Sequence, residues 1–223
     1  MSFLCRLGRS ERGQSSVELV AALPFVLLVG ALVWQCALVL ILVRREQGSL
    51  SWPVLKEALW LQAPRSPRTG RRGGRLWLLL IPLTVALAAE ELLPKLPTPA
   101  TRDFSIFLSS DGGQSFLSGN WGWFTLLVVE FALNTMLGEE LLFRGLLLPR
   151  MRGAFGRWDW VANGFLFAAY HMHVPWVIPQ TLLVDTFVLA GASRRYRSAL
   201  IGIIVHSAQS VYFTVLVLAL VLR

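Results

Sequence analysis

Ionisable side chains inside apolar stretches are the first indication of chemistry in this sequence. Placing such a side chain in the centre of a bilayer costs about 2.5–3.5 kcal/mol even on mild scales, so those that persist line sites or form pairs. They gather in the C-terminal half of the chain: Glu130, Glu139, Glu140, Arg144, His171, Asp185 and His206. Carboxylates and imidazoles together can activate a water molecule for attack on a carbonyl group.

The densest group is the sequence GEELLFRG, which contains Glu139, Glu140 and Arg144. Glu140 and Arg144 are four residues apart, so on a helix they share one face and form an ion pair. Glu139 points about 100° away, which leaves its carboxylate free to act as a general base. The structural alternative is a helix end at the membrane interface, with Arg144 extending into water.

Two further groups contain the histidines. Phe167 and His171 are four residues apart, so the phenyl ring can form one wall of a pocket around the imidazole. His206 is followed by Gln209 and Ser210 on the same side of a helix, and these polar side chains can support an oxyanion. A histidine in an apolar helix is often only a packing residue, but two of them with a free carboxylate indicate a catalytic site.

A metal ion is one of two ways in which these residues can activate water. Glu139, His171 and His206 are suitable ligands for a divalent metal such as zinc, and the same three side chains can act without one. The HExxH pattern of soluble zinc proteases is absent from the sequence. The sequence alone therefore leaves the metal question open.

The elements that position these residues are predicted to be membrane helices. The chain has 223 residues, of which 55% are hydrophobic and 15% charged, so a soluble globular domain is excluded. We predict an all-α, polytopic membrane helical bundle of about six transmembrane helices. The apolar stretches that form them are Leu19–Val43, Leu76–Leu93, Trp121–Leu137, Trp160–Tyr170, Val174–Ala192 and Ala199–Leu222. Prolines, glycines and serines between Pro94 and Asn120 predict a connection without helices.

The formal net charge of +8 lies in short basic segments between the apolar stretches. Such segments favour the lipid bilayer as the anionic partner and argue against nucleic acid. The positive-inside rule places Arg44–Arg75, Arg150–Arg157 and Arg194–Arg197 together on the cytoplasmic side. The N-terminal arginines, Arg6, Arg9 and Arg12, are the exception, because this topology puts them outside.

The N-terminal part of the chain, about 30 residues, resembles the start of a tight-adherence pseudopilin. In that resemblance Gly13 precedes a cleavage point and Glu18 opens the apolar helix, whereas the simpler interpretation is a signal anchor. We predict an N-terminal anchor helix at 1–48, a basic cytoplasmic linker at 49–75 and a helical core at 76–223. The chemistry-bearing motifs of that core fall within 121–222.

With these groups in this order, the chain resembles the CPBP family of intramembrane proteases, also called the Abi family. The family includes CAAX prenyl proteases and bacteriocin-processing enzymes. The matching motifs are EExxxR at Glu139, Glu140 and Arg144, FxxxH at Phe167 and His171, and HxxxN beginning at His206. The resemblance covers about the last hundred residues.

The resemblance implies a cavity open to the cytoplasmic side and cleavage of a membrane-anchored protein or peptide, at a bacterial inner membrane. By analogy, Glu139 and His171 activate water, His206 and its partner bind the oxyanion, and Arg144 holds the glutamate pair. The chain departs from the family at Ser210, where Asn or Asp is usual, so either Gln209 contributes or the oxyanion site is weaker. The alternative is a non-catalytic membrane scaffold or binding member of the same family.

Overall fold

The computed structural model describes residues 29–94, 96–99 and 104–223 of the chain. This part is helical, and it contains no strand, only an isolated bridge between Arg65 and Arg72. The predicted all-α fold class is therefore confirmed. The prepilin-like start with Gly13 and Glu18 lies outside the described residues.

In the part of the chain that the structure describes, six helical stretches run along the length of the molecule, and several of them combine more than one type of helix. They are the helix at 29–47, η1 (Gly74–Leu79) with α3 (Leu80–Ala88) and η2 (Ala89–Leu92), α6 (Trp121–Ala132) with η4 (Leu133–Leu147) and α7 (Leu148–Arg150), α9 (Asp159–Tyr170), α10 (Ile178–Asp185) with η8 (Thr186–Gly191) and α11 (Ala192–Tyr196), and α12 (Ala199–Val221). Shorter elements connect them: α2 (Trp52–Ala58), α4 (Phe104–Ser109), α5 (Asp111–Leu117), α8 (Arg152–Phe155), η5 (Gly156–Trp158), η6 (His171–His173) and η7 (Pro175–Val177).

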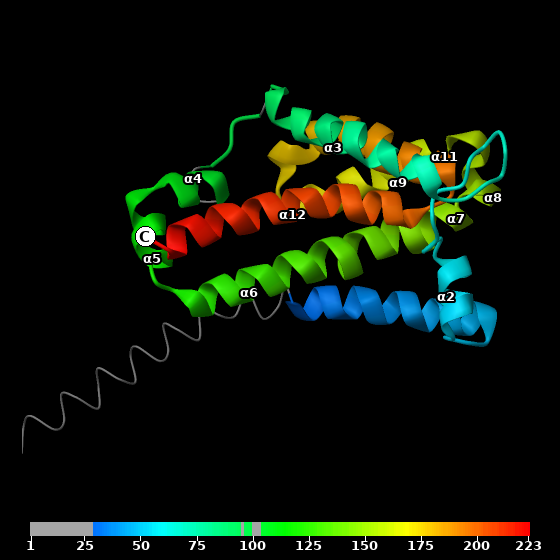
Figure 1. Cartoon of the computed structure of the whole chain (residues 1–223), viewed down its shortest axis with the longest axis horizontal. Coiled ribbons are helices and arrows are strands. Elements are labelled where there is room, and N and C mark those ends of the chain that lie inside the picture. Colours follow the sequence, from blue (N-terminus) through cyan, green and yellow to red (C-terminus); the bar gives the residue numbers. More distant parts are fainter. Residues whose placement is uncertain (1–28, 95, 100–103) are drawn as a thin grey trace, which may run out of the picture.

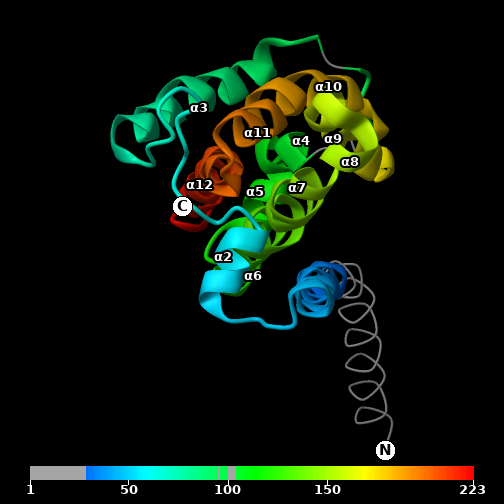
Figure 2. The same ribbon diagram turned by 90° about the vertical axis from the view of Figure 1, so that its right-hand side faces the viewer.

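Helix α12 runs through the middle of the bundle, with α3 on one side and the α6–η4 helix on the other (Figure 1). The helix at 29–47 lies along the outer side of η4 (Figures 1 and 2). It buries Val39 and Val43 in a cluster with Leu59, Leu141 and Leu146, so it shares an apolar core with the segment that contains the glutamate pair. Full burial of one such side chain stabilises the fold by about 1.5–3 kcal/mol.

Two of these stretches pass a test of length and composition for crossing a membrane, namely Pro175–Tyr196 and Ala199–Val221. The six predicted transmembrane helices therefore stay a prediction. Apolar side chains are nevertheless exposed along the outside of the bundle, as with Leu78, Ile81 and Val85 on the α3 stretch and Val211 on α12. A large exposed apolar surface is typical of contact with lipid or a protein partner.

The basic segments lie together at one end of the bundle. Helices α2, α7, α8 and α11 are found at that end, whereas α4, α5 and the C-terminus lie at the opposite end (Figure 1). The three segments that the charge pattern assigns to one side, 44–75, 150–157 and 194–197, thus share an end of the molecule. The membrane orientation derived from them remains a prediction.

The connection between Pro94 and Asn120 contains helices, contrary to the sequence-based expectation. Helix α5 forms because the hydroxyl of Ser110 accepts a hydrogen bond from the backbone N–H of Gly113 at 3.1 Å, which caps its first turn. Leu108 of α4 and Leu117 of α5 are buried in a cluster with Val217 of α12. Tertiary packing and a helix cap therefore outweigh the local helix-breaking composition.

Candidate active site

The glutamate pair lies in η4, a segment with the wider π-helical hydrogen-bond pattern. Glu139 and Glu140 are both buried, with 4% and 0% of their surface exposed. Segments of π-helix are uncommon and often occur at functional sites. Close packing on both sides holds the segment in place, because Gly138 lies against Leu32 and Gly202 lies against Glu140.

Glu140 is held by two cationic or hydrogen-bonding partners. Its Oε1 lies 3.1 Å from Nη1 of Arg144 in an ion pair that is fully buried on both sides. The same oxygen lies 3.0 Å from Nδ1 of His206, which donates a hydrogen bond to it from α12. A buried charge requires such partners, since the isolated carboxylate would be strongly destabilised.

Arg144 also packs against the aromatic residues of the second motif. Its guanidinium carbon lies 4.0 Å from the centre of the Phe167 ring, within the range of a cation–π interaction. The Phe167 ring in turn meets the His171 ring edge-to-face with 4.8 Å between centres. Phe167 therefore connects the ion pair of η4 to the histidine at the end of α9.

Glu139 faces both histidines. Its Oε1 lies 4.0 Å from Nε2 of His171, and its Oε2 lies 3.9 Å from Nε2 of His206. Both distances are too long for a direct hydrogen bond. A water molecule about 2.8 Å from an oxygen and a nitrogen that are this far apart would form hydrogen bonds to both.

The second nitrogen of each imidazole is already occupied. Nδ1 of His171 lies 2.9 Å from the backbone carbonyl oxygen of Phe167, which can only accept, so this nitrogen carries hydrogen. Nδ1 of His206 is bonded to Glu140. Both rings are thus oriented with Nε2 toward Glu139.

The part of the chain that the structure describes contains no group of three or more His, Cys, Asp or Glu side chains that could hold a metal ion. Glu139, His171 and His206, which the sequence offers as zinc ligands, do not form such a group as they are placed here.

A cavity of about 330 Å³ adjoins the two histidines. Phe167, His171 and His206 line it, and so does Gln209. Ser210 is not among the lining residues, because its hydroxyl forms a 2.8 Å hydrogen bond with Thr135 of η4. Of the two residues considered for oxyanion support, Gln209 is the one at the cavity.

Several residues that line this cavity were not among the site residues predicted from the sequence. Asp185 is buried in α10 and lines the cavity, as does Thr181 four residues earlier on the same helical face. That i, i+4 pair of polar residues in an apolar helix was the available signal. Glu90 and Glu91 lie in η2, which ends the α3 stretch, and both line this cavity.

The cavity extends toward the end of the bundle that lies away from the basic segments. Its wall includes Thr98, beyond η2, and Ser105 of α4, and α4 lies at that end (Figure 1). The expectation drawn from the family resemblance, a cavity open to the cytoplasmic side, stays a prediction.

The motif residues all lie within a segment that matches a protein-family model. Residues 121–212 match the family model described as type II CAAX prenyl endopeptidase, Rce1-like. This part of the chain is similar to the Rce1-like CAAX protease family. The resemblance stated from the sequence is thereby confirmed. No curated protein and no solved structure matches the chain.

The similarity of this segment to the Rce1-like family supports a coarse activity, that of a membrane endopeptidase. The matched segment begins at α6 and ends within α12, so it contains Glu139, Glu140, Arg144, Phe167, His171, His206, Gln209 and Ser210. The helix at 29–47 and the α3 stretch lie outside the matched segment, although both pack against it.

Proposed function

We propose that this protein is an intramembrane endopeptidase that hydrolyses a peptide bond of a membrane-associated protein or peptide, at a bacterial inner membrane, by a glutamate-activated water molecule. The observation that carries the proposal is the position of Glu139, whose two carboxylate oxygens face the Nε2 atoms of His171 and His206 at 4.0 and 3.9 Å. The similarity of residues 121–212 to a protease family supports the reaction class.

Glu139 acts as the general base. A water molecule between Glu139 and His171 donates one hydrogen bond to the carboxylate and one to the bare Nε2 of the imidazole. Glu139 removes a proton as the water oxygen bonds to the carbonyl carbon of the substrate, which gives a tetrahedral intermediate with a negative oxygen. The same proton then passes from Glu139 to the amide nitrogen, and the C–N bond breaks to release an acid and an amine.

Charge balance assigns a different role to His206. The buried cluster contains two carboxylates, Glu139 and Glu140, and one guanidinium, Arg144, so a protonated His206 makes the cluster neutral. Its Nε2–H is then a donor to the developing oxyanion, with the amide of Gln209 as a second donor. Glu140 and Arg144 position this imidazole and do not contact the substrate.

The test compares the membrane proteomes of cells that contain wild type, Glu139→Gln, His171→Ala or the matched control Glu130→Gln. Glu130 is a half-buried carboxyl on α6 that does not line the cavity. Peptide termini that disappear in both site variants and persist in the control would establish the peptidase and identify its substrate. A parallel arm with a chelator tests whether cleavage needs a metal ion.

The scaffold alternative predicts the opposite result. If Glu139→Gln and His171→Ala leave every terminus unchanged while restoring the phenotype of a deletion strain, the peptidase proposal is wrong. Equal abundance of all variants in the membrane, measured by quantitative immunoblotting, is required for either conclusion.

A further inference from the structure

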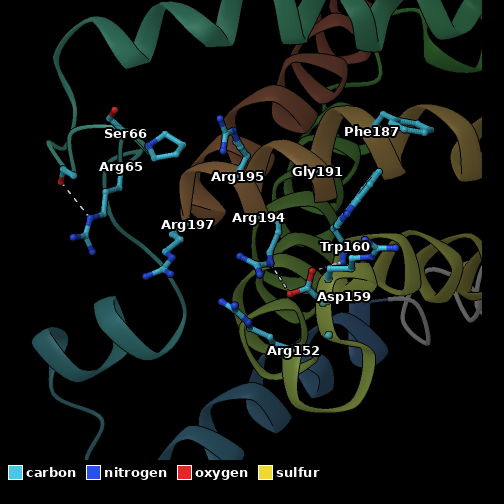
Figure 3. A pocket seen from close by; sticks show the side chains of 14 residues that line it. Arg65, Ser66, Arg152, Asp159, Trp160, Phe187, Gly191, Arg194, Arg195 and Arg197 are labelled. Atoms are coloured by element: carbon cyan, nitrogen blue, oxygen red, sulfur yellow. Dashed lines mark hydrogen bonds and ion pairs between the residues drawn. The ribbon is translucent and has the colours of Figure 1, made fainter.

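A second cavity, of about 830 Å³, lies at the basic end of the bundle, among α8, α9, η8, α11 and the loop that follows α2 (Figure 3). Six arginines line it, and Asp159 is the one carboxylate among the lining residues that the structure describes. The six are Arg65, Arg152, Arg157, Arg194, Arg195 and Arg197. Figure 3 shows Arg152 and Arg194 beside Asp159, with Arg65 and Arg197 across from them.

The positive charge in this pocket exceeds what the protein itself neutralises. Oδ2 of the buried Asp159 lies 2.5 Å from Nε of Arg194. This ion pair neutralises one of the six arginines. The guanidinium of Arg65 donates a hydrogen bond to the backbone carbonyl oxygen of Gly70. Arg152, Arg195 and Arg197 form no ion pair with any residue that the structure describes. Like charges held this close repel one another, so a bound anion would be stabilised.

The backbone fixes the arginines in this arrangement. The N–H of Arg65 donates to the carbonyl oxygen of Tyr196 at 2.8 Å, and the N–H of Ala199 donates to that of Trp60 at 2.9 Å. The hydroxyl of Ser198 donates to the carbonyl oxygen of Gln62 at 2.5 Å. The loop after α2 is thus tied to the α11–α12 junction, and the pocket does not depend on flexible side chains alone.

One wall of the pocket is aromatic. The rings of Trp160 and Phe187 meet edge-to-face with 5.3 Å between centres, and 61% of the Phe187 surface is exposed. An exposed ring beside a group of guanidinium groups fits a ligand that has both a phosphate group and an apolar chain. Guanidinium groups bind phosphate oxygens through paired hydrogen bonds.

We propose that this pocket binds the phosphate headgroup of an anionic phospholipid, with the acyl chains leaving along Phe187. Basic pockets between membrane helices on the cytoplasmic side are suited to such headgroups. Because the site lies at the basic end and the catalytic cavity extends toward the other end, the two are separate. The proposal does not depend on the peptidase mechanism.

The test uses the purified full chain in detergent, titrated with phosphatidylglycerol and followed by native mass spectrometry. The pocket variant is Arg152→Gln with Arg197→Gln. The matched control is Arg68→Gln with Arg71→Gln, which removes the same charge from the same basic end but from exposed positions that do not line the pocket. We expect the pocket variant to bind about 30-fold more weakly and the control to change by no more than about twofold.

Three further arms make the result decisive. The double variant Arg152→Lys with Arg197→Lys keeps the positive charge and replaces the glutamine variant if that variant does not fold. It should bind the lipid more weakly than wild type, because lysine cannot form the paired hydrogen bonds of a guanidinium group. Zwitterionic phosphatidylcholine should bind wild type at least about tenfold more weakly. Equal effects of the pocket and control variants would overturn the proposal. Displacement of the lipid by an equal concentration of inorganic phosphate would overturn the assignment to a lipid.

Discussion

His206 Nδ1 donates a hydrogen bond to Glu140 Oε1 at 3.0 Å, which joins α12 to η4 in the interior of the bundle. Arg144 shares the same carboxylate oxygen at 3.1 Å. Because Glu140 is occupied in this way, the adjacent Glu139 is the carboxylate that remains directed at the Nε2 atoms of the two histidines. Two neighbouring residues of the same type therefore have different partners.

Replacing Glu139 by Gln should abolish the general base and leave the packing intact. We expect the cleavage rate to fall by about 10²–10⁴-fold, the range for loss of acid–base catalysis. The thermal unfolding midpoint should match that of Glu130→Gln. Cleavage at the wild-type rate by purified Glu139→Gln would contradict the mechanism.

Replacing Arg144 by Met should instead reduce stability. Removal of one partner of a fully buried ion pair leaves Glu140 without its main countercharge and costs about 3–5 kcal/mol. The double variant with Glu140→Gln should regain part of this loss, because the uncompensated charge is then gone. Chemical unfolding of the two single variants and the double variant measures this coupling, and additive effects would argue against it.

Gly202 is expected to tolerate no side chain. A Cβ at this position would overlap Oε2 of Glu140 and lie 3.3 Å from Oγ of Ser193. Gly202→Ala should displace Glu140 and its bond to His206 and lower the cleavage rate by about 10²-fold. Gly30→Ala is the control, because that Cβ has no atom within 4 Å; it should leave the rate unchanged.

Gln209 and Ser210 should differ sharply in their effect on the rate. Gln209→Leu removes a donor at the cavity, and we expect kcat to fall by about 10²–10³-fold. Ser210→Ala breaks the bond to Thr135 and should cost about 1 kcal/mol of stability with little change in kcat. Steady-state kinetics on both variants separate the two cases, and a larger kcat effect at Ser210 would reverse the assignment.

The ion pair between Glu46 and Arg150 should make a small part of the stability depend on pH. Hydrogen bonds from Arg150 hold the pKa of the Glu46 carboxyl below its ordinary value, and this carboxylate lies beyond the predicted first span. A lowered folded-state pKa means that the stabilisation is present above the unfolded-state pKa and is lost as pH falls through the folded-state value. Because the pair is partly exposed, its contribution is about 0.2–1 kcal/mol.

Thermal unfolding of wild type and Glu46→Gln across the acidic range tests this dependence. The difference between them should shrink as the pH falls below the ordinary pKa of a glutamate and should vanish when Glu46 is protonated. Glu57→Gln, at an exposed position on α2, is the control and should show no such trend. A constant difference at every pH would show that the effect is not electrostatic.

Local geometry explains what sequence could predict about the site. Residues four apart on a helix share a face, so the Glu140–Arg144 pair and the contact of Phe167 with His171 both follow from spacing. The short fourth apolar stretch likewise appears as α9, which ends at Tyr170 and places His171 at a helix terminus.

The spacing of residues along the chain could not predict how the helices pack against one another. The rotation of α12 against η4 is set by the fit of Gly202 to Glu140, and it directs Gln209 to the cavity and Ser210 to Thr135. Asp185 was left outside the motifs for the same reason, because only packing decides which face of α10 meets the cavity. The pocket of arginines depends on how three separate connections meet at one end of the bundle.

The contact between Gly138 and the helix at 29–47 affects how this protein can be divided. Leu32 and Gln35 lie against Gly138, and Gln35 donates a hydrogen bond to the hydroxyl of Tyr170 at 3.0 Å. These contacts flank Glu139 and His171 along the chain. The segment that matches the family model, 121–212, is therefore shorter than the segment that must be expressed to obtain a native site. Fragments cut at the ends of this segment would leave Leu141 and Leu146 without the side chains of Val39 and Val43 that cover them.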